Sequence, residues 1–194
     1  SSDREKLKKI FEWVRDNVRY IAVEIGIGGY QPHPAPEILR NQYGDCKDMT
    51  TLLCAMAEAS EIKVDEVLIS TKPNGLPDTT LPSPFQFNHA IAYCPDIGEE
   101  GIWMDATQKG TPFGKIPWYN QGLPALQVNQ QGEGELLMTP QYPADSNQVQ
   151  ILWDVHLNRD GSATVKGETR FRGAVAEEVR EDFFYVTQYL QRQW

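Results

Sequence analysis

The chain has 194 residues, 40% of them hydrophobic and 23% charged, which is typical of a globular protein with a sizeable core. Its net charge of −9 argues against nucleic acid, anionic membrane surfaces and polyanionic substrates as main partners. No apolar run approaches the roughly 20 residues of a membrane span, so we expect no membrane insertion in this fragment. We expect a fragment because the chain starts without Met and ends in the middle of a pattern.

The N-terminal part of the chain predicts a helix, an extended segment and a loop. Apolar residues spaced three and four apart predict a helix with Asp3 as its N-cap. Residues 20–27 have the composition of an extended, largely buried segment. Glycines and prolines over residues 26–36 predict a loop, which lacks the spacing of a dinucleotide-binding motif. A short helix over residues 36–41 then leads into the cysteine region.

Cys46 stands at the start of the clearest amphipathic helix. The apolar stripe of that helix consists of Met49, Leu52, Leu53, Met56 and Ala57. Cys46 lies on this stripe, and Asp45 is suited to cap the helix. Unpaired N–H groups and the positive end of the helix dipole favour the thiolate, which is the reactive form. A lone cysteine more often simply packs in a core, so residues downstream must decide between the two interpretations.

A histidine and an aspartate occur on the next predicted hairpin. A strand over residues 64–71 and a loop over residues 72–84 precede it. Residues 87–93 and 101–107 then predict two antiparallel strands. The expected register places Asp105 opposite His89, with Cβ atoms roughly 4.5 to 5.5 Å apart, so that the carboxylate can hold the imidazole by a hydrogen bond. Each residue alone is more often structural, and their pairing favours a functional role.

The rest of the chain predicts a linker and a second module. Residues 127–147 are rich in Gln, Gly and Pro, and we interpret them as a linker between a core at residues 1–126 and a module at residues 148–194. The module is predicted to contain two strands and a helix, over residues 149–157, 163–171 and 174–192. Because one hairpin and one helix make a poor independent domain, we expect the truncated start of a larger β-rich module.

The other cysteines and histidines point to no further chemistry. The three cysteines show no C-x-x-C spacing, so neither a disulfide scaffold nor a zinc site is expected. We expect Cys54 and Cys94 to lie in the core. His33, on a proline-rich loop, and His156, at a strand end, are expected on the surface.

The order cysteine, histidine, aspartate is that of a papain-like triad. The sequences that carry it are Tyr-Gly-Asp-Cys-Lys-Asp at residues 43–48, Phe-Asn-His-Ala at residues 87–90 and Trp-Met-Asp-Ala-Thr at residues 103–107. With the helix around residues 13–20, they resemble the core of the bacterial transglutaminase-like superfamily, up to about Gly122. The resemblance implies an α+β fold of papain-like, transglutaminase-core type. In that fold the nucleophile helix packs on an antiparallel sheet, followed here by a partial β-hairpin and helix.

The resemblance also implies roles for individual residues. Cys46 would be the nucleophile, His89 the general base and acid, and Asp105 the orienting carboxylate. The oxyanion would be held by the Cys46 backbone N–H and a second donor, for which the loop around Tyr30 and Gln31 is the best region by analogy. This chemistry requires no cofactor and no metal.

Three functions fit this resemblance. With water as acceptor the chain would be a protease or amidase, and with an amine it would be a crosslinking transglutaminase. We expect hydrolysis, because nothing in the sequence marks a lysine-accepting groove or a calcium site. A non-catalytic binding or scaffold module on the same fold stays open. Expected partners are a protein or peptide substrate and further domains of the same protein, and the resemblance implies an exported or periplasmic location.

Overall fold

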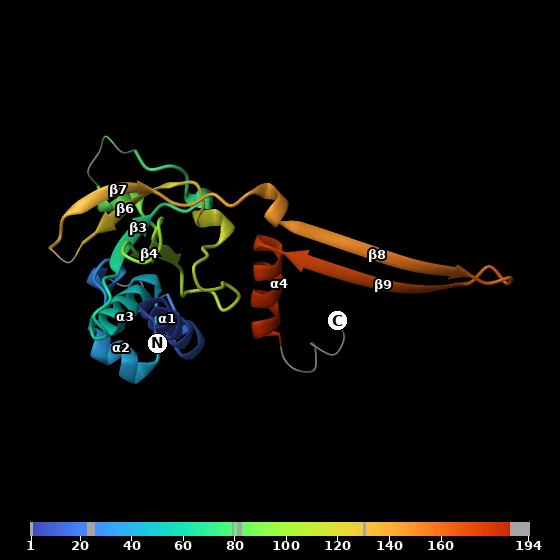
Figure 1. The fold of residues 1–194 in the computed structure, drawn as a ribbon, viewed down its shortest axis with the longest axis horizontal. Helices are drawn as coiled ribbons and strands as arrows, with labels where there is room; N and C mark the ends of the chain where they lie inside the picture. Colours follow the sequence, from blue (N-terminus) through green and yellow to red (C-terminus); the bar gives the residue numbers. More distant parts are fainter. Residues whose placement is uncertain (1, 23–25, 79, 81–82, 130, 187–194) are drawn as a thin grey trace. The chain divides into compact units, whose positions relative to one another are not determined.

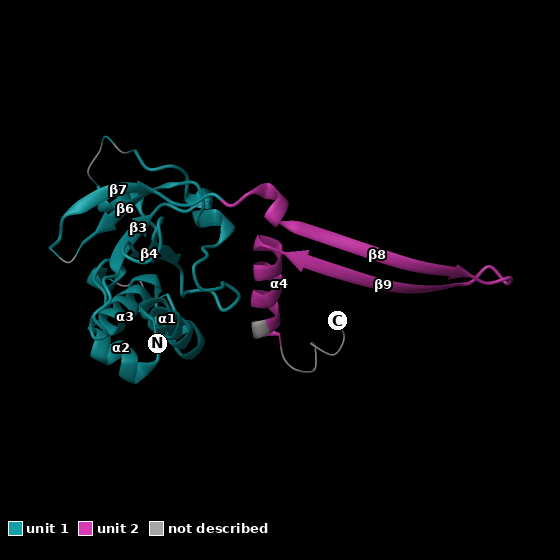
Figure 2. Cartoon of the chain, viewed as in Figure 1, with its two compact units in different colours: residues 1–141 teal, residues 142–194 magenta. Residues whose placement is uncertain are grey.

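The computed structural model describes residues 2–22, 26–78, 80, 83–129 and 131–186 of the chain. It divides into two compact units, Ser1–Gln141 and Tyr142–Trp194 (Figure 2). Among the described residues, no helix combines the length and the apolar character that crossing a bilayer requires.

Unit 1 begins with three helices that lie together on one side of a sheet (Figure 1). They are α1 (Asp3–Asn17), α2 (Ala35–Asn41) and α3 (Cys46–Glu58). The expected cap at Asp3 is wrong by one residue, because the Ser2 hydroxyl accepts from the Glu5 N–H and the Glu5 carboxylate binds the Ser2 N–H in return. The expected cap of α3 is confirmed: Asp45 accepts from the Asp48 N–H.

The sheet of unit 1 has five antiparallel strands in the order β5-β4-β3-β6-β7. Their bounds are β3 (Asp65–Ile69), β4 (His89–Cys94), β5 (Ile102–Met104), β6 (Pro124–Val128) and β7 (Gly134–Met138). Short 3-10 helices lie in the connections, at Gly26–Gly29, Lys72–Asn74, Pro84–Gln86 and Trp118–Asn120. The α+β class with an antiparallel sheet is therefore confirmed.

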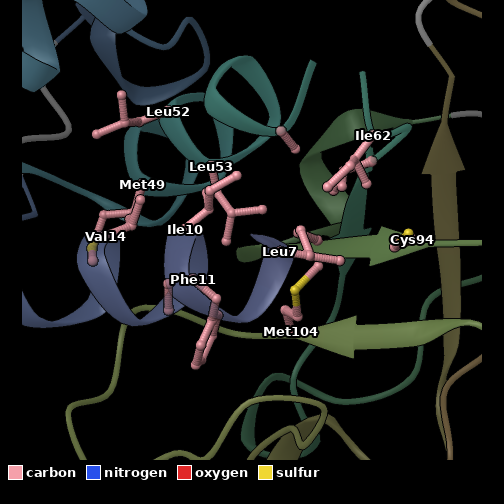
Figure 3. Packing of buried hydrophobic residues seen from close by; sticks show 14 of the residues in the cluster. Leu7, Ile10, Phe11, Val14, Met49, Leu52, Leu53, Ile62, Cys94 and Met104 are labelled. Atoms are coloured by element: carbon pink, nitrogen blue, oxygen red, sulfur yellow. The ribbon is translucent and has the colours of Figure 1, made fainter. Parts of the chain in front are cut away.

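The core of unit 1 forms where the apolar stripes of α1 and α3 meet the sheet (Figure 3). Leu7 and Phe11 of α1 are fully buried, and Leu53 of α3 is 1% exposed. Met104 and Cys94 close the core from β5 and β4 with no exposed surface. The helix that carries Cys46 is thereby fixed on the sheet that carries His89, since burying apolar area is the main driving force of folding.

The extended segment expected at residues 20–27 is mostly absent where the structure describes it. Strand β1 is only Arg19–Tyr20, and its partner is the two-residue strand β2, Tyr43–Gly44. Tyr20 is 39% exposed and Ile27 is 76% exposed. The prediction of burial was wrong because no sheet face covers a two-residue ribbon. Residues 23–25 lie outside the described residues.

The predicted start of the linker, residue 127, lies inside a strand of the first unit. Strand β6 extends to Val128 and pairs with β3, and β7 pairs with β6 at the edge of the sheet, so the first unit continues to Gln141. The polar composition misled because β7 is exposed and because Gln127 donates to the buried carboxylate of Asp65 at 2.6 Å. The core boundary therefore moves from residue 126 to residue 141.

Unit 2 contains a long antiparallel ribbon followed by a helix. The ribbon is β8 (Gln148–Leu157) and β9 (Ala163–Arg172), preceded by a 3-10 turn at Ala144–Ser146. Helix α4 (Ala174–Tyr185) packs against β9. It ends earlier than the predicted residue 192, and residues 187–194 lie outside the described residues.

Candidate active site

Cys46 is the first residue of α3, where backbone N–H groups have no partner within the helix. Its side chain is partly exposed. The neighbouring charges are paired with each other, because the Lys47 ammonium group, whose side chain is 12% exposed, binds the Asp45 carboxylate. The Asp45 carboxylate also caps the helix by accepting from the Asp48 N–H, so the residues before and after Cys46 are bound to each other.

His89 is the first residue of β4 and links Cys46 to Asp105. Its Nε2 lies 2.9 Å from Oδ2 of Asp105, and its side chain is 10% exposed. The Cys46 side chain lies close enough to the imidazole to contribute to raising the pKa of His89. Because Nε2 faces Asp105, Nδ1 is the nitrogen that remains for the thiol. The structure thus brings the three residues of the expected triad together.

The strand register differs from the one expected. Ala92 pairs with Met104 and Tyr93 pairs with Trp103, so continuing this ladder would place Asp105 opposite Ile91. His89 and Asp105 are therefore diagonal neighbours on the same face of the sheet, two residues out of direct opposition. Diagonal neighbours are roughly 7–8 Å apart at the backbone, a distance that the imidazole side chain of His89 can span.

The Asp105 carboxylate is buried and accepts four hydrogen bonds. Oδ1 accepts from the backbone N–H of Thr107 at 3.0 Å and from its hydroxyl at 2.6 Å. Oδ2 accepts from His89 and, at 2.9 Å, from the Asn120 amide. Burial alone would raise the pKa of Asp105, but the charge and hydrogen bond of His89 and the bonds from Thr107 lower it below its ordinary value.

The same contacts act on His89 in the opposite sense. Burial lowers the pKa of its imidazole, but the Asp105 carboxylate, with a further contribution from Cys46, raises this pKa to about 10. The imidazolium form is therefore the stable one at neutral pH. An imidazolium ion beside a thiol is the arrangement in which the thiolate is stabilised.

Two neighbours of Asp105 were missed at the sequence level. Thr107 follows Asp105 by two residues, a spacing at which an aspartate commonly accepts from the backbone, so this contact had a recognisable pattern. Asn120 comes fifteen residues later in an irregular segment, and no sequence pattern indicates it. Its Oδ1 is buried and has no hydrogen-bond partner among the described residues.

The two candidate oxyanion or substrate residues lie on an exposed loop. Tyr30 is 64% exposed, and its ring meets the Phe85 ring edge-on at 5.5 Å. Gln31 is also exposed. Among the described residues, neither side chain is hydrogen-bonded to Cys46, His89 or Asp105. Their roles as substrate contacts remain predictions.

The other two cysteines lie in or against the core, as expected. Cys94 is fully buried, and Cys54 is partly buried and packs against the core cluster. Burial, with the charge of nearby Glu66, raises the pKa of Cys54 well above its ordinary value. Burial also raises the pKa of Cys94. In the described part of the chain, no group of three or more His, Cys, Asp or Glu residues is arranged to hold a metal ion.

The family model of the transglutaminase-like superfamily matches residues 1–73, which include Cys46 and its helix but end before His89 and Asp105. No curated protein matches the chain. A crystal structure of "a putative protease" from Parabacteroides distasonis ATCC 8503 aligns with a TM-score of 0.57 at 16% identity, over 78% of this chain and 30% of that one. A structure described as "a putative cysteine protease" from Cytophaga hutchinsonii aligns with a TM-score of 0.41 at 19% identity, over 84% of this chain and 44% of that one.

The resemblance to the transglutaminase-like superfamily is thereby confirmed over residues 1–73, and the fold is shared with the solved "putative protease". The chain spans less than half the length of the two solved chains that it matches.

Proposed function

We propose that this chain is a cysteine-dependent acyl-transfer enzyme that hydrolyses peptide or amide bonds through a thioester. The observation that supports this most is the series formed by Cys46, the His89 imidazole whose pKa it helps to raise, and the buried Asp105 carboxylate, which is hydrogen-bonded to that imidazole. Such a series suits nucleophilic catalysis, because a thiolate forms beside an imidazolium ion whose orientation is fixed by a carboxylate.

In the first half-reaction the Cys46 thiolate attacks the carbonyl carbon and forms a C–S bond. The oxyanion that develops is stabilised by the Cys46 backbone N–H at the helix start and by a second donor from the Tyr30–Gln31 loop. The C–N bond then breaks, and protonated His89 gives its Nδ1 proton to the leaving amine. The products are a thioester on Cys46, a free amine and neutral His89.

In the second half-reaction His89 removes a proton from a water molecule that attacks the thioester. The C–S bond breaks, the carboxylic acid is released, and the pair of Cys46 thiolate and His89 imidazolium is restored. Asp105 holds Nε2–H throughout and so keeps Nδ1 directed at the reacting atoms. We propose water as acceptor because water needs no binding site of its own, whereas an amine acceptor does.

The direct test is to trap the thioester. The protein is incubated with a peptide mixture in isotopically labelled water, with and without a primary amine, and analysed by mass spectrometry. We expect an acyl adduct on Cys46 alone, and product carboxylates that carry the label. Products that carry the amine in place of the labelled oxygen would identify a transglutaminase. If no adduct forms on Cys46, the result would favour a non-catalytic binding module.

A control for this experiment comes from the chain itself. Iodoacetamide at about pH 6 should alkylate Cys46 faster than Cys54 or Cys94, whose raised pKa values keep them as neutral thiols. His89→Ala should slow the alkylation of Cys46, because the imidazolium partner is lost. Equal rates at all three cysteines would contradict the proposed nucleophile.

A further inference from the structure

A second buried carboxylate lies in the helix of Cys46 and takes no part in the mechanism above. The side chain of Asp48, two residues after Cys46, is only 4% exposed. Its Oδ2 accepts from the Asp45 backbone N–H at 3.2 Å. Its Oδ1 accepts from the backbone N–H of His33 at 2.8 Å, and both of its oxygens lie 3.1 Å from Nδ1 of His33. A buried carboxylate with several donors is an anchor, because moving it away from them would leave an unpaired charge.

His33 is the outer half of this pair and belongs to the glycine-rich loop. Its side chain is 51% exposed, although both its backbone and its ring are bound to Asp48. Upstream, the Tyr30 and Gln31 N–H groups both donate to the Ile27 carbonyl at 2.9 Å, which closes a compact turn. The residues proposed as substrate contacts therefore lie between a closed turn and a histidine that is bound within one helical turn of Cys46.

The same loop is also connected to the histidine side of the site. The Tyr30 ring meets the Phe85 ring edge-on, with an interplanar angle of 89°. Phe85 is four residues before His89, which limits the separation of their Cα atoms to roughly 14 Å. Both rings are more than half exposed, so the contact is not part of the core. The loop thus contacts the helix of Cys46 and the 3-10 helix that precedes the strand of His89.

We infer that His33 and Asp48 are a positioning pair that holds the Gly26–His33 loop against the first turn of the Cys46 helix. This inference rests on the proposed acyl transfer and specifies how the second oxyanion donor is held. An oxyanion donor acts only within about 2.7–3.1 Å of the developing charge, and an exposed loop without an anchor does not keep that precision. His33 and Asp48 act through the loop and do not contact the substrate.

The test compares two reactions of Cys46 that differ in their need for the loop. Alkylation by iodoacetamide forms no oxyanion, so it reports the thiolate alone. Acylation by p-nitrophenyl acetate passes through an oxyanion, so its rate also depends on the position of the loop. His33→Ala should leave the alkylation rate unchanged and lower the acylation rate roughly 10- to 100-fold, the size expected for a misplacement of about 1 Å.

Two further variants separate the hydrogen bond from other effects of the substitution. His33→Asn keeps an N–H donor near the position of Nδ1, so its acylation rate should stay within about threefold of wild type. His156→Ala removes the exposed histidine of the second unit and should change neither rate.

Several outcomes would overturn the inference. Acylation of His33→Ala at the wild-type rate would remove the positioning role. A parallel fall in alkylation and acylation would mean that His33 acts on the thiol or the helix. Failure of His33→Asn to exceed His33→Ala would exclude the hydrogen bond as the cause. A wild-type protein that is alkylated at Cys46 but never acylated would instead refute the proposed function, and this inference with it.

Discussion

At the scale of single residues, Asp105 shows how a buried charge is kept next to a thiol. Four donors surround its carboxylate, and one of them is the imidazole whose protonated form it stabilises. Buried carboxylates are tolerated when every lone pair is used in this way. Asn120 differs from the other donors because its Nδ2 donates to Asp105 while its buried Oδ1 has no hydrogen-bond partner among the described residues.

The Asn120 amide leads to a prediction for Asp105→Asn. The new amide would point its NH₂ group at Asn120, which can rotate so that its unpartnered oxygen accepts, and the fold should be kept. His89 would then have to accept at Nε2 and carry its proton on Nδ1, the wrong tautomer for a base facing Cys46. We expect acylation to fall about 100-fold, less than the roughly 10⁴-fold of a serine-protease triad, because a thiolate needs less help from its base.

The matching measurement is the acylation rate of wild type, Asp105→Asn and Asp105→Ala, together with thermal melting. Wild-type acylation in both variants with only a lowered Tm would make Asp105 a purely structural residue, and the reactive unit would then be a dyad of Cys46 and His89.

The pH dependence of stability follows from His89. Its pKa in the folded protein is about 10, above the ordinary 6.5, so the stability that it contributes is complete below about pH 6.5 and is lost as the pH rises towards 10. Asp105 acts oppositely: its contribution is complete above its ordinary pKa and is lost as the pH falls through the lowered value.

Urea unfolding of wild type and His89→Gln from about pH 6 to about pH 10 tests this expectation. The free-energy difference between the two proteins should be largest at the acid end and should shrink as the pH rises. A difference that is independent of pH over this range would show that His89 stabilises the fold by packing alone.

At the scale of elements, the start of α3 depends on the glycine before it. A Cβ added at Gly44 would lie 2.5 Å from Cβ of Asp48 and 2.8 Å from its Oδ2, closer than real contacts allow. Gly44 also accepts the Ile21 N–H at 2.8 Å, so its backbone is not free to withdraw. The Asp48 anchor and the first turn of the helix are thus packed directly on this position.

We therefore expect Gly44→Ala to lower the free energy of unfolding by roughly 1–3 kcal/mol and to slow alkylation of Cys46, since the first turn must shift. Gly98→Ala is the matched comparison. Gly98 has a positive φ of 85° and open space around it, so substitution there costs only backbone strain of roughly 1–2 kcal/mol. The Gly98 variant should keep its alkylation rate, and an equal slowing in both variants would refute the steric explanation.

The ribbon of unit 2 is amphipathic along its whole length. Alternate residues of β8 form one apolar face, made of Val149, Ile151, Trp153, Val155 and Leu157, and each is at least 49% exposed. Trp153 lies over Gly167 of β9, where an added Cβ would come within 2.6 Å of the ring. Helix α4 packs against β9, while these side chains of β8 stay about half exposed or more.

At the scale of the whole molecule, the proposed chemistry belongs to one unit. The core cluster, the Cys46 helix and the strands around His89 all lie within Ser1–Gln141. Residues 1–141 alone are therefore expected to unfold cooperatively in urea and to be alkylated at Cys46 at the rate of the 194-residue chain. A fragment that is folded by circular dichroism but unreactive at Cys46 would show that unit 2 contributes to the site.

The sequence by itself determined the elements whose patterns are local. The apolar stripe and the Asp45 cap predicted α3 with Cys46 at its start. The alternation of apolar residues predicted the strand that carries His89 and the strand that ends one residue before Asp105. These predictions held because side-chain periodicity and capping depend on neighbours a few residues apart.

Only the tertiary structure decided what depends on residues far apart in the chain. The polar stretch around Gln127 is a strand because its partners, β3 and Asp65, supply the pairing and the hydrogen bond. Asn120 reaches Asp105, and His33 reaches Asp48, across fifteen residues each. No local pattern encodes such contacts, because they form only when packing of the apolar core brings separate segments to the same place.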